Sequence, residues 1–105
     1  MFVVTRFRVP ADDAQFRRQA QEVLELLMSK PGNIGGTLGR NVDDAELWVL
    51  STTWRNTGSY RRALGSPDVK ANAWPLLYRA LDEPSAYEVA TGTNPLNEPE
   101  ARSIG

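Results

Sequence analysis

The sequence predicts an α+β fold of the ferredoxin-like type, in which an antiparallel four-stranded sheet carries its helices on one face. The expected elements alternate in the order strand, helix, strand, strand, helix, strand, and a short acidic turn joins the two middle strands. The 105 residues are the length of one domain. The expected segments are a strand over 2–9, a helix over 12–30, strands over 36–41 and 46–54, a helix over 57–65, a broken helix over 66–82 and a strand over 85–91.

The first strand and the first helix follow from local composition. Residues 2–9 are rich in β-branched and aromatic side chains and are followed by Pro10, which is typical of a strand. Asp12 is expected to cap the helix, and Gln15 completes a capping box three residues later. Apolar residues then recur at helical spacing until Pro31-Gly32, which predicts the end of the helix.

Turn and cap residues define the elements that follow. Asp43-Asp44 lies between two strand segments and predicts an antiparallel hairpin. Asn56 or Thr57 is expected to cap the next helix, and Ser66-Pro67 supplies the N-cap and first residue of another. Pro75 predicts a break in that last helix near the preceding residue.

The predicted sheet carries apolar side chains on both faces. In the strand over 46–54, Leu47 and Val49 face opposite to Trp48, Leu50 and Trp54. Because one layer of helices covers only one face, we expect a second copy of the chain to cover the other face, which makes a homodimer. The domain is predicted over residues 1–91, and residues 92–105 are expected to form a C-terminal extension that is disordered or packs on the partner subunit.

Composition limits the function. Twelve basic against thirteen acidic residues give a net charge of −1, which argues against nucleic acid or an anionic membrane surface as a partner. No apolar run has the length of a membrane span, and no signal peptide is visible, so a cytoplasmic location is expected. The sequence contains neither cysteine nor histidine, which excludes thiolate nucleophiles, histidine bases and the usual ligands of zinc and haem.

Several short motifs, taken together, resemble the antibiotic biosynthesis monooxygenase family of dimeric α+β barrels, over about residues 2–91. Pro31-Gly32 leads into Thr37-Leu38-Gly39-Arg40 and the acidic turn, and a strand then ends in Trp54 before Tyr60-Arg61-Arg62-Ala63-Leu64. The spacing from Trp54 to Tyr60 and the opening Thr5-Arg6-Phe7 are most similar to the cofactor-independent, quinone-forming monooxygenases of aromatic polyketide pathways.

The resemblance implies a pocket between the sheet and the helices. There a polycyclic phenol or anthrone would give up a proton and reduce O₂, and the resulting peroxide would collapse to a quinone and water. No cofactor and no metal would be needed. The resemblance implies catalytic roles for Trp54, Thr5 and Tyr60, and a substrate-binding set of Phe7, Trp48, Leu50, Thr52 and Trp74.

Two positions depart from the pattern of the quinone-forming members. Those members carry asparagines where this chain has Thr5 and Leu50, and a leucine side chain can neither donate nor accept a hydrogen bond. The haem-degrading branch uses a histidine that this chain lacks. Two alternatives to an oxygenase therefore stay open: a non-catalytic homologue that binds a small aromatic compound, and a polyketide cyclase of the same fold. In the structural alternative, Trp54 and Tyr60 serve packing alone.

Overall fold

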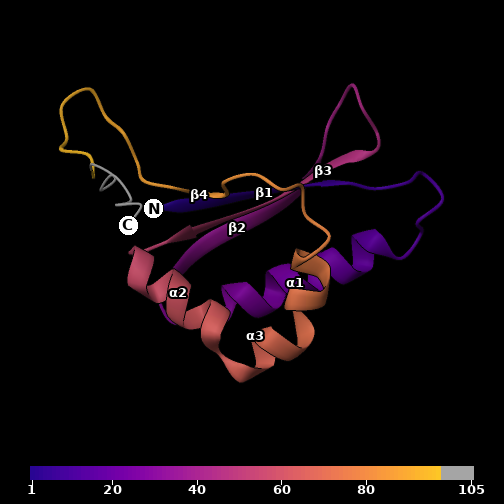
Figure 1. Ribbon diagram of the computed structural model, residues 1–105, viewed down its shortest axis with the longest axis horizontal. Coiled ribbons are helices and arrows are strands. Elements are labelled where there is room, and N and C mark those ends of the chain that lie inside the picture. The colour runs from indigo at the N-terminus through magenta and orange to yellow at the C-terminus, as the bar shows by residue number, and fades with distance from the viewer. Residues whose placement is uncertain (98–105) are drawn as a thin grey trace, which may run out of the picture.

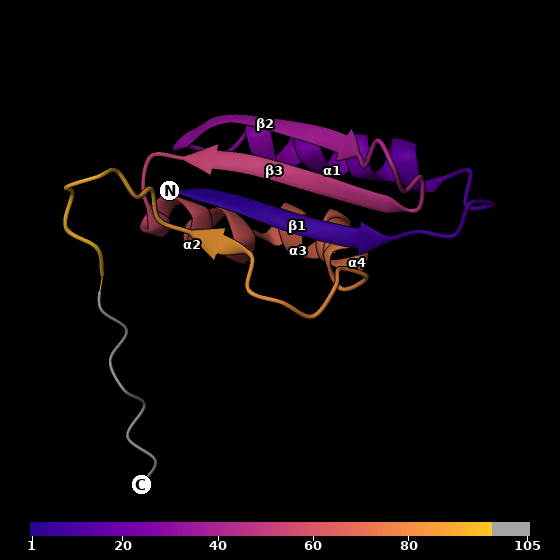
Figure 2. The ribbon, with the colours of Figure 1, turned by 90° about the horizontal axis from the view of Figure 1, so that it is seen from above.

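The computed structural model describes residues 1–97 and contains one sheet with the helices gathered on one of its faces (Figure 1). The four strands run antiparallel to their neighbours in the order β2-β3-β1-β4 (Figure 2). This confirms the predicted ferredoxin-like α+β fold. The elements are β1 (Phe2–Arg8), α1 (Phe16–Met28), β2 (Asn33–Arg40), β3 (Leu47–Trp54), α2 (Thr57–Gly65), α3 (Pro67–Asn72), α4 (Trp74–Leu77) and β4 (Ala86–Tyr87).

The pairing of β1 with β3 fixes which side chains face the helices. Thr5 lies opposite Leu50, and Phe7 lies opposite Trp48, so these four side chains share the inner face of the sheet. Phe7, Leu50 and Trp54 are almost completely buried on that face, together with Phe16 of α1. The shared inner face predicted for alternate residues of β3 is therefore confirmed.

The helix α1 begins at Phe16, with Gln15 at the N-cap position, and therefore later than the predicted helix over 12–30. The backbone N–H of Phe16 donates to Asp13 Oδ1 at 3.1 Å, whereas Gln15 forms no side-chain cap. Before the helix, the Asp13 N–H donates to the Pro10 carbonyl at 3.0 Å. Asp12 lies within the turn that this hydrogen bond closes. The capping box expected from Asp12 is therefore wrong, and the next carboxylate reaches the helix amides instead.

The last strand is shorter than the predicted range of 85–91. Tyr87 pairs with Phe2, and Ala86 pairs with Val3, so any residue after Tyr87 would extend beyond the first residue of β1. The partner strand ends there, and β4 consequently spans two residues. Figures 1 and 2 show the following segment leaving the sheet as a loop. Residues 98–105 of the predicted extension lie outside the described residues.

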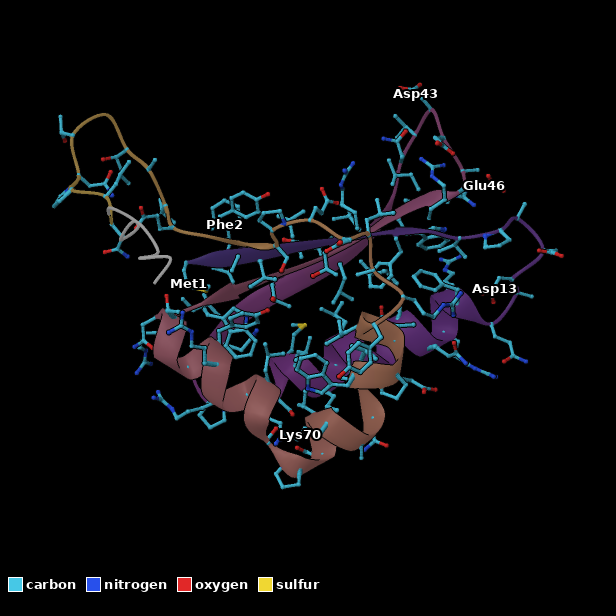
Figure 3. All side chains as sticks on the ribbon, viewed as in Figure 1. Met1, Phe2, Asp13, Asp43, Glu46 and Lys70 are labelled. Atoms are coloured by element: carbon cyan, nitrogen blue, oxygen red, sulfur yellow. The ribbon has the colours of Figure 1, made fainter. Side chains whose placement is uncertain are left out.

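The outer face of the sheet carries a half-buried apolar surface, made by Phe2, Val4, Leu47 and Val49. Phe2 lies on the side of the sheet away from the helices (Figure 3), and its ring stacks on Tyr87 with the centroids 5.5 Å apart. No helix of residues 1–97 covers this face (Figure 1). Among the same residues, no helix is long and apolar enough to span a membrane.

Candidate active site

A cavity of about 180 Å³ lies between β1 and the helical layer, on the side of β1 that faces β4. Its walls come from three places: the middle of β1, helices α2 and α4, and the loop that leads to β4. The lining residues are Val4, Thr5 and Arg6 of β1, Tyr60 and Leu64 of α2, Trp74 and Leu77 of α4, and Ala80, Leu81, Glu83 and Ser85 beyond them. Aromatic and aliphatic side chains therefore enclose a small number of polar groups, which is typical of a ligand pocket.

The loop over 81–85 forms the outer wall of this cavity. It is tied to β1 at both ends, because the Leu81 N–H donates to the Arg6 carbonyl at 2.9 Å and the Val4 N–H donates to the Ser85 carbonyl at 2.7 Å. Between these points, Arg6 donates two hydrogen bonds to the Glu83 carboxylate, at 2.8 and 3.0 Å. This ion pair holds the pKa of Glu83 below its usual range, so the contact persists at neutral pH and is lost only as the pH falls through that lowered pKa.

Besides the Arg6–Glu83 ion pair, the polar side chains that line the cavity are hydroxyls. Thr5 contributes its side chain from the inner face of β1, and Tyr60 and Ser85 approach from the helical layer and the loop. Burial raises the pKa of the Tyr60 phenol, and a hydrogen bond with Ser85 partly opposes that effect. The Tyr60 hydroxyl is therefore protonated at neutral pH and can donate a hydrogen bond to an oxyanion.

The raised pKa of Tyr60 predicts that its phenol ionises at a higher pH than an ordinary tyrosine. In an absorbance titration at alkaline pH, a component with a pKa above the ordinary tyrosine value of about 10 is expected. Burial disfavours the ionised phenol in the folded state, so stability is retained below about pH 10 and decreases as the pH rises further. Tyr60→Phe is expected to remove the late component, and its persistence in that variant would contradict the assignment.

The structure brings three of the predicted site residues to the cavity: Thr5, Tyr60 and Trp74. The Trp74 N–H donates to the Leu64 carbonyl at 2.9 Å, so its indole is fixed in the wall. The Trp54 ring packs against Tyr60 with the centroids 5.7 Å apart, directly behind the cavity. Trp54 therefore positions Tyr60 through ring contact.

The other predicted residues lie outside the cavity. The Trp54 N–H donates to Thr52 Oγ1 at 2.8 Å inside the core, so this donor is already used within the protein. Leu50 lies opposite Thr5 on the neighbouring strand β3 and is 2% exposed. Phe7 packs against Phe16 in the core. Trp48 lies near the beginning of β3 and lines a different pocket.

Several lining residues have no signal in the sequence. Leu64 and Leu77 are apolar helix positions, which the sequence alone does not distinguish from core residues. Ser85 and Glu83 lie in a loop without a motif, and only the tertiary pairing of the loop with β1 brings them to Thr5. The contribution of this loop is therefore visible only in the structure.

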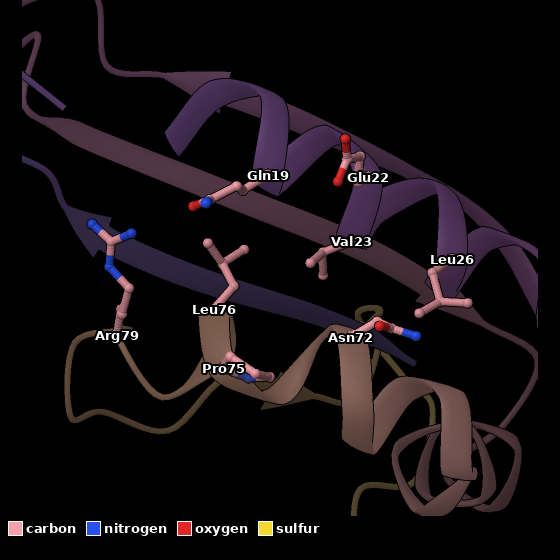
Figure 4. A pocket seen from close by; sticks show the side chains of 8 residues that line it. All are labelled: Gln19, Glu22, Val23, Leu26, Asn72, Pro75, Leu76 and Arg79. Carbon is pink, nitrogen blue, oxygen red and sulfur yellow. The ribbon is translucent and has the colours of Figure 1, made fainter. Parts of the chain in front are cut away.

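A second cavity, of about 360 Å³, lies between α1 and the segment containing α3 and α4 (Figure 4). Gln19 and Glu22 of α1 lie across this cavity from Asn72 and Arg79. Apolar side chains, including that of Leu76, also line it. It contains no predicted site residue and no residue of the sheet. The cavity lined by Thr5, Tyr60, Trp74 and Ser85 is the better candidate for an active site. Within residues 1–97, no cluster of three or more histidine, cysteine or acidic side chains is arranged to hold a metal ion.

Comparison with known proteins identifies the family. Residues 1–73 match the antibiotic biosynthesis monooxygenase family, and the chain belongs to it. The resemblance noted in the sequence is thereby confirmed. No curated protein sequence matches this chain.

Solved structures agree with this assignment. SnoaB, a cofactor-independent oxygenase from Streptomyces nogalater, superposes with a TM-score of 0.68 at 26% identity, over 92% of this chain and 96% of its own. A Mycobacterium tuberculosis protein gives 0.65 at 21% identity, over 92% and 95% of the two chains. A conserved protein from Methanosarcina mazei gives 0.66 at 22% identity, over 81% and 84%. The last two show the fold alone.

Proposed function

We propose that the chain is a cofactor-independent monooxygenase that oxidises a polycyclic aromatic substrate, of the anthrone or hydroquinone type, with O₂ to a quinone. The observation that carries this proposal is that Thr5 and Tyr60, two residues with hydroxyl groups, line one cavity together with aromatic and aliphatic side chains. Membership of the family and the likeness to SnoaB support the reaction class.

The proposed reaction draws its electrons from the substrate. An anthrone loses a proton from its central CH₂ group to water, and the resulting carbanion, whose charge extends onto the carbonyl oxygen, reduces O₂ and forms a C–O bond. The peroxide then loses its second C–H proton, its O–O bond breaks, and a quinone carbonyl and one molecule of water result. Donors that stabilise the oxyanion lower the barrier to the first step.

The residues of this chain take distinct roles in the proposal. Thr5 and Tyr60 donate hydrogen bonds to the substrate oxygen, while Trp74 forms an apolar wall and Trp54 supports Tyr60 from behind. The cavity of about 180 Å³ is smaller than typical ligand pockets of roughly 300–1,000 Å³. Substrate entry therefore requires the loop over 81–85 to move. An exposed ion pair, two backbone hydrogen bonds and the contact between Ser85 and Tyr60 oppose that movement.

Removing either donor tests the proposal. Thr5→Val and Tyr60→Phe keep the shape of the cavity wall and are each expected to lower the rate of quinone formation from anthrone by roughly 10²–10³, as loss of one oxyanion donor does elsewhere. Tyr78→Phe makes the same chemical change at an exposed position outside the cavity and should leave the rate unchanged. Equal rates in all three variants would overturn the assigned roles.

One observation favours a second candidate function, that of a non-catalytic protein that binds a small aromatic compound. Leu50 is a buried, apolar side chain opposite Thr5, so no amide supports the substrate oxygen there. This alternative predicts saturable binding of anthrone, seen as quenching of tryptophan fluorescence, with no oxidation above the enzyme-free rate.

We also infer that the chain forms a homodimer through the outer face of the sheet. Phe2, Val4, Leu47 and Val49 form an apolar surface there, and Ile34 at the edge is 68% exposed. Sedimentation equilibrium at micromolar concentration is expected to give twice the chain mass of 11.7 kDa. Val49→Glu, which places a charge at the centre of this face, should shift the protein towards the monomer. A wild-type monomer would contradict the inference.

A further inference from the structure

A basic pocket lies at the outer edge of the sheet, where α1 packs over β2. It is an open pocket of about 330 Å³ lined by Arg17, Gln21, Leu38, Gly39, Arg40 and Trp48. Two of these six residues are arginines, and none is acidic. The basic pocket shares no lining residue with the candidate active site. A ligand bound there would therefore not contact the residues that line the candidate active site.

Strand pairing holds the centre of the basic pocket in place. Arg40 of β2 lies directly opposite Trp48 of β3, and its guanidinium carbon is 5.6 Å from the centre of the indole ring. This cation–π contact keeps the guanidinium close to the pocket. Trp48 is fixed in turn by an edge contact with the buried Phe16, at a centroid distance of 5.4 Å.

The basic pocket offers hydrogen-bond donors that have no partner within residues 1–97. Arg6, Arg8, Lys30 and Arg79 form ion pairs in this part of the chain, but Arg17 and Arg40 form none. The indole N–H groups of Trp54 and Trp74 donate to protein oxygens, whereas that of Trp48 has no protein partner among these residues. Two guanidinium groups and one indole N–H therefore remain available to a ligand.

We propose that the basic pocket binds a small aromatic carboxylate. A planar guanidinium presents two parallel N–H groups that match the two oxygens of a carboxylate, and two arginines supply the opposite charge. Leu38 and the Trp48 ring provide apolar surface for the body of the ligand. The volume of about 330 Å³ lies at the lower end of the range for ligand pockets, which suits a compound of one or two rings.

The binding is tested by ¹H–¹⁵N NMR titration of the wild-type protein with sodium benzoate. The sequence has three tryptophans, so three indole N–H signals are expected, and loss of one in Trp48→Phe assigns it. Benzoate is expected to shift the Trp48 signal saturably. Arg17→Gln and Arg40→Gln, both at exposed positions, should each weaken binding by about tenfold or more. Arg18→Gln, the same change at the neighbouring position outside the pocket, should leave the affinity unchanged.

Three results would overturn the proposal. Absence of a saturable shift at millimolar benzoate would show that the basic pocket binds no such ligand. Benzamide binding as tightly as benzoate would exclude recognition of the charge. Inorganic phosphate binding as tightly as benzoate would exclude the aromatic class. None of these results depends on oxygenase activity, so failure here and failure of the proposed function are distinguishable.

Discussion

Replacing Trp54 by alanine is expected to lower the free energy of unfolding by about 3–5 kcal/mol, the usual cost of removing a buried tryptophan. Trp54 is 1% exposed, packs against Tyr60 and donates its N–H to Thr52. In a domain of this size, 1 kcal/mol corresponds to roughly 4–8 °C, so the melting temperature should fall by about 12 °C or more. Thermal unfolding followed by circular dichroism measures the change.

A paired substitution separates the hydrogen bond from the packing. Trp54→Phe keeps an aromatic ring but leaves Thr52 Oγ1 without its donor, at a cost of about 1–3 kcal/mol on top of the lost volume. Adding Thr52→Val to Trp54→Phe removes the unpaired hydroxyl and is expected to recover part of that loss. If the double variant loses as much free energy of unfolding as the two single variants lose in sum, the hydrogen bond contributes nothing to stability.

Replacing Gly32 by alanine is expected to be the second strongly destabilising change, by about 2–5 kcal/mol. Gly32 has a φ of +87°, in the left-handed region that disfavours residues with a Cβ atom. A Cβ there would also overlap Oγ and Cβ of Ser59, which is buried at the start of α2. The substitution therefore strains the turn into β2 and pushes α2 away from it.

Gly35→Ala is the matched control, since a Cβ atom at Gly35 meets no other atom within 4 Å. Its φ is not in the left-handed region, and the expected change in stability is less than about 0.5 kcal/mol. Chemical denaturation of the two variants makes the comparison. Similar losses in both would show that the conformation of Gly32 and its contact with Ser59 are unimportant.

Local chemistry predicted most of the fold. The Ser66-Pro67 pair starts α3, Asn56 caps α2 by accepting from the Ser59 N–H at 2.8 Å, and the expected break in the last helix separates α3 from α4 before Trp74. These signals depend on residues close in the sequence. The cap expected at Asp12 fails for a local reason, because the Asp13 N–H bonds the nearby Pro10 carbonyl in a turn that precedes the helix. The short β4 has a tertiary cause, because β1 ends opposite Tyr87.

The candidate site was predicted only in part for the same reason. Period-two alternation correctly puts Trp48, Leu50 and Trp54 on one face of β3, but it does not say which residues reach a cavity. The loop over 81–85 and the helix positions decide this, and both depend on contacts between distant segments. Trp48 illustrates the point. It lies near the beginning of β3, where it contacts Arg40 and lines a separate pocket together with residues of α1.

The most direct test of the proposed function is oxidation of anthrone under ¹⁸O₂ by the purified protein, with the quinone analysed by mass spectrometry. A monooxygenase transfers one atom of O₂ to the product and the other to water. We expect a quinone that carries one ¹⁸O atom, formed faster than without protein, and formed more slowly by Tyr60→Phe. Labelled quinone at no more than the enzyme-free rate would contradict a monooxygenase function for this chain.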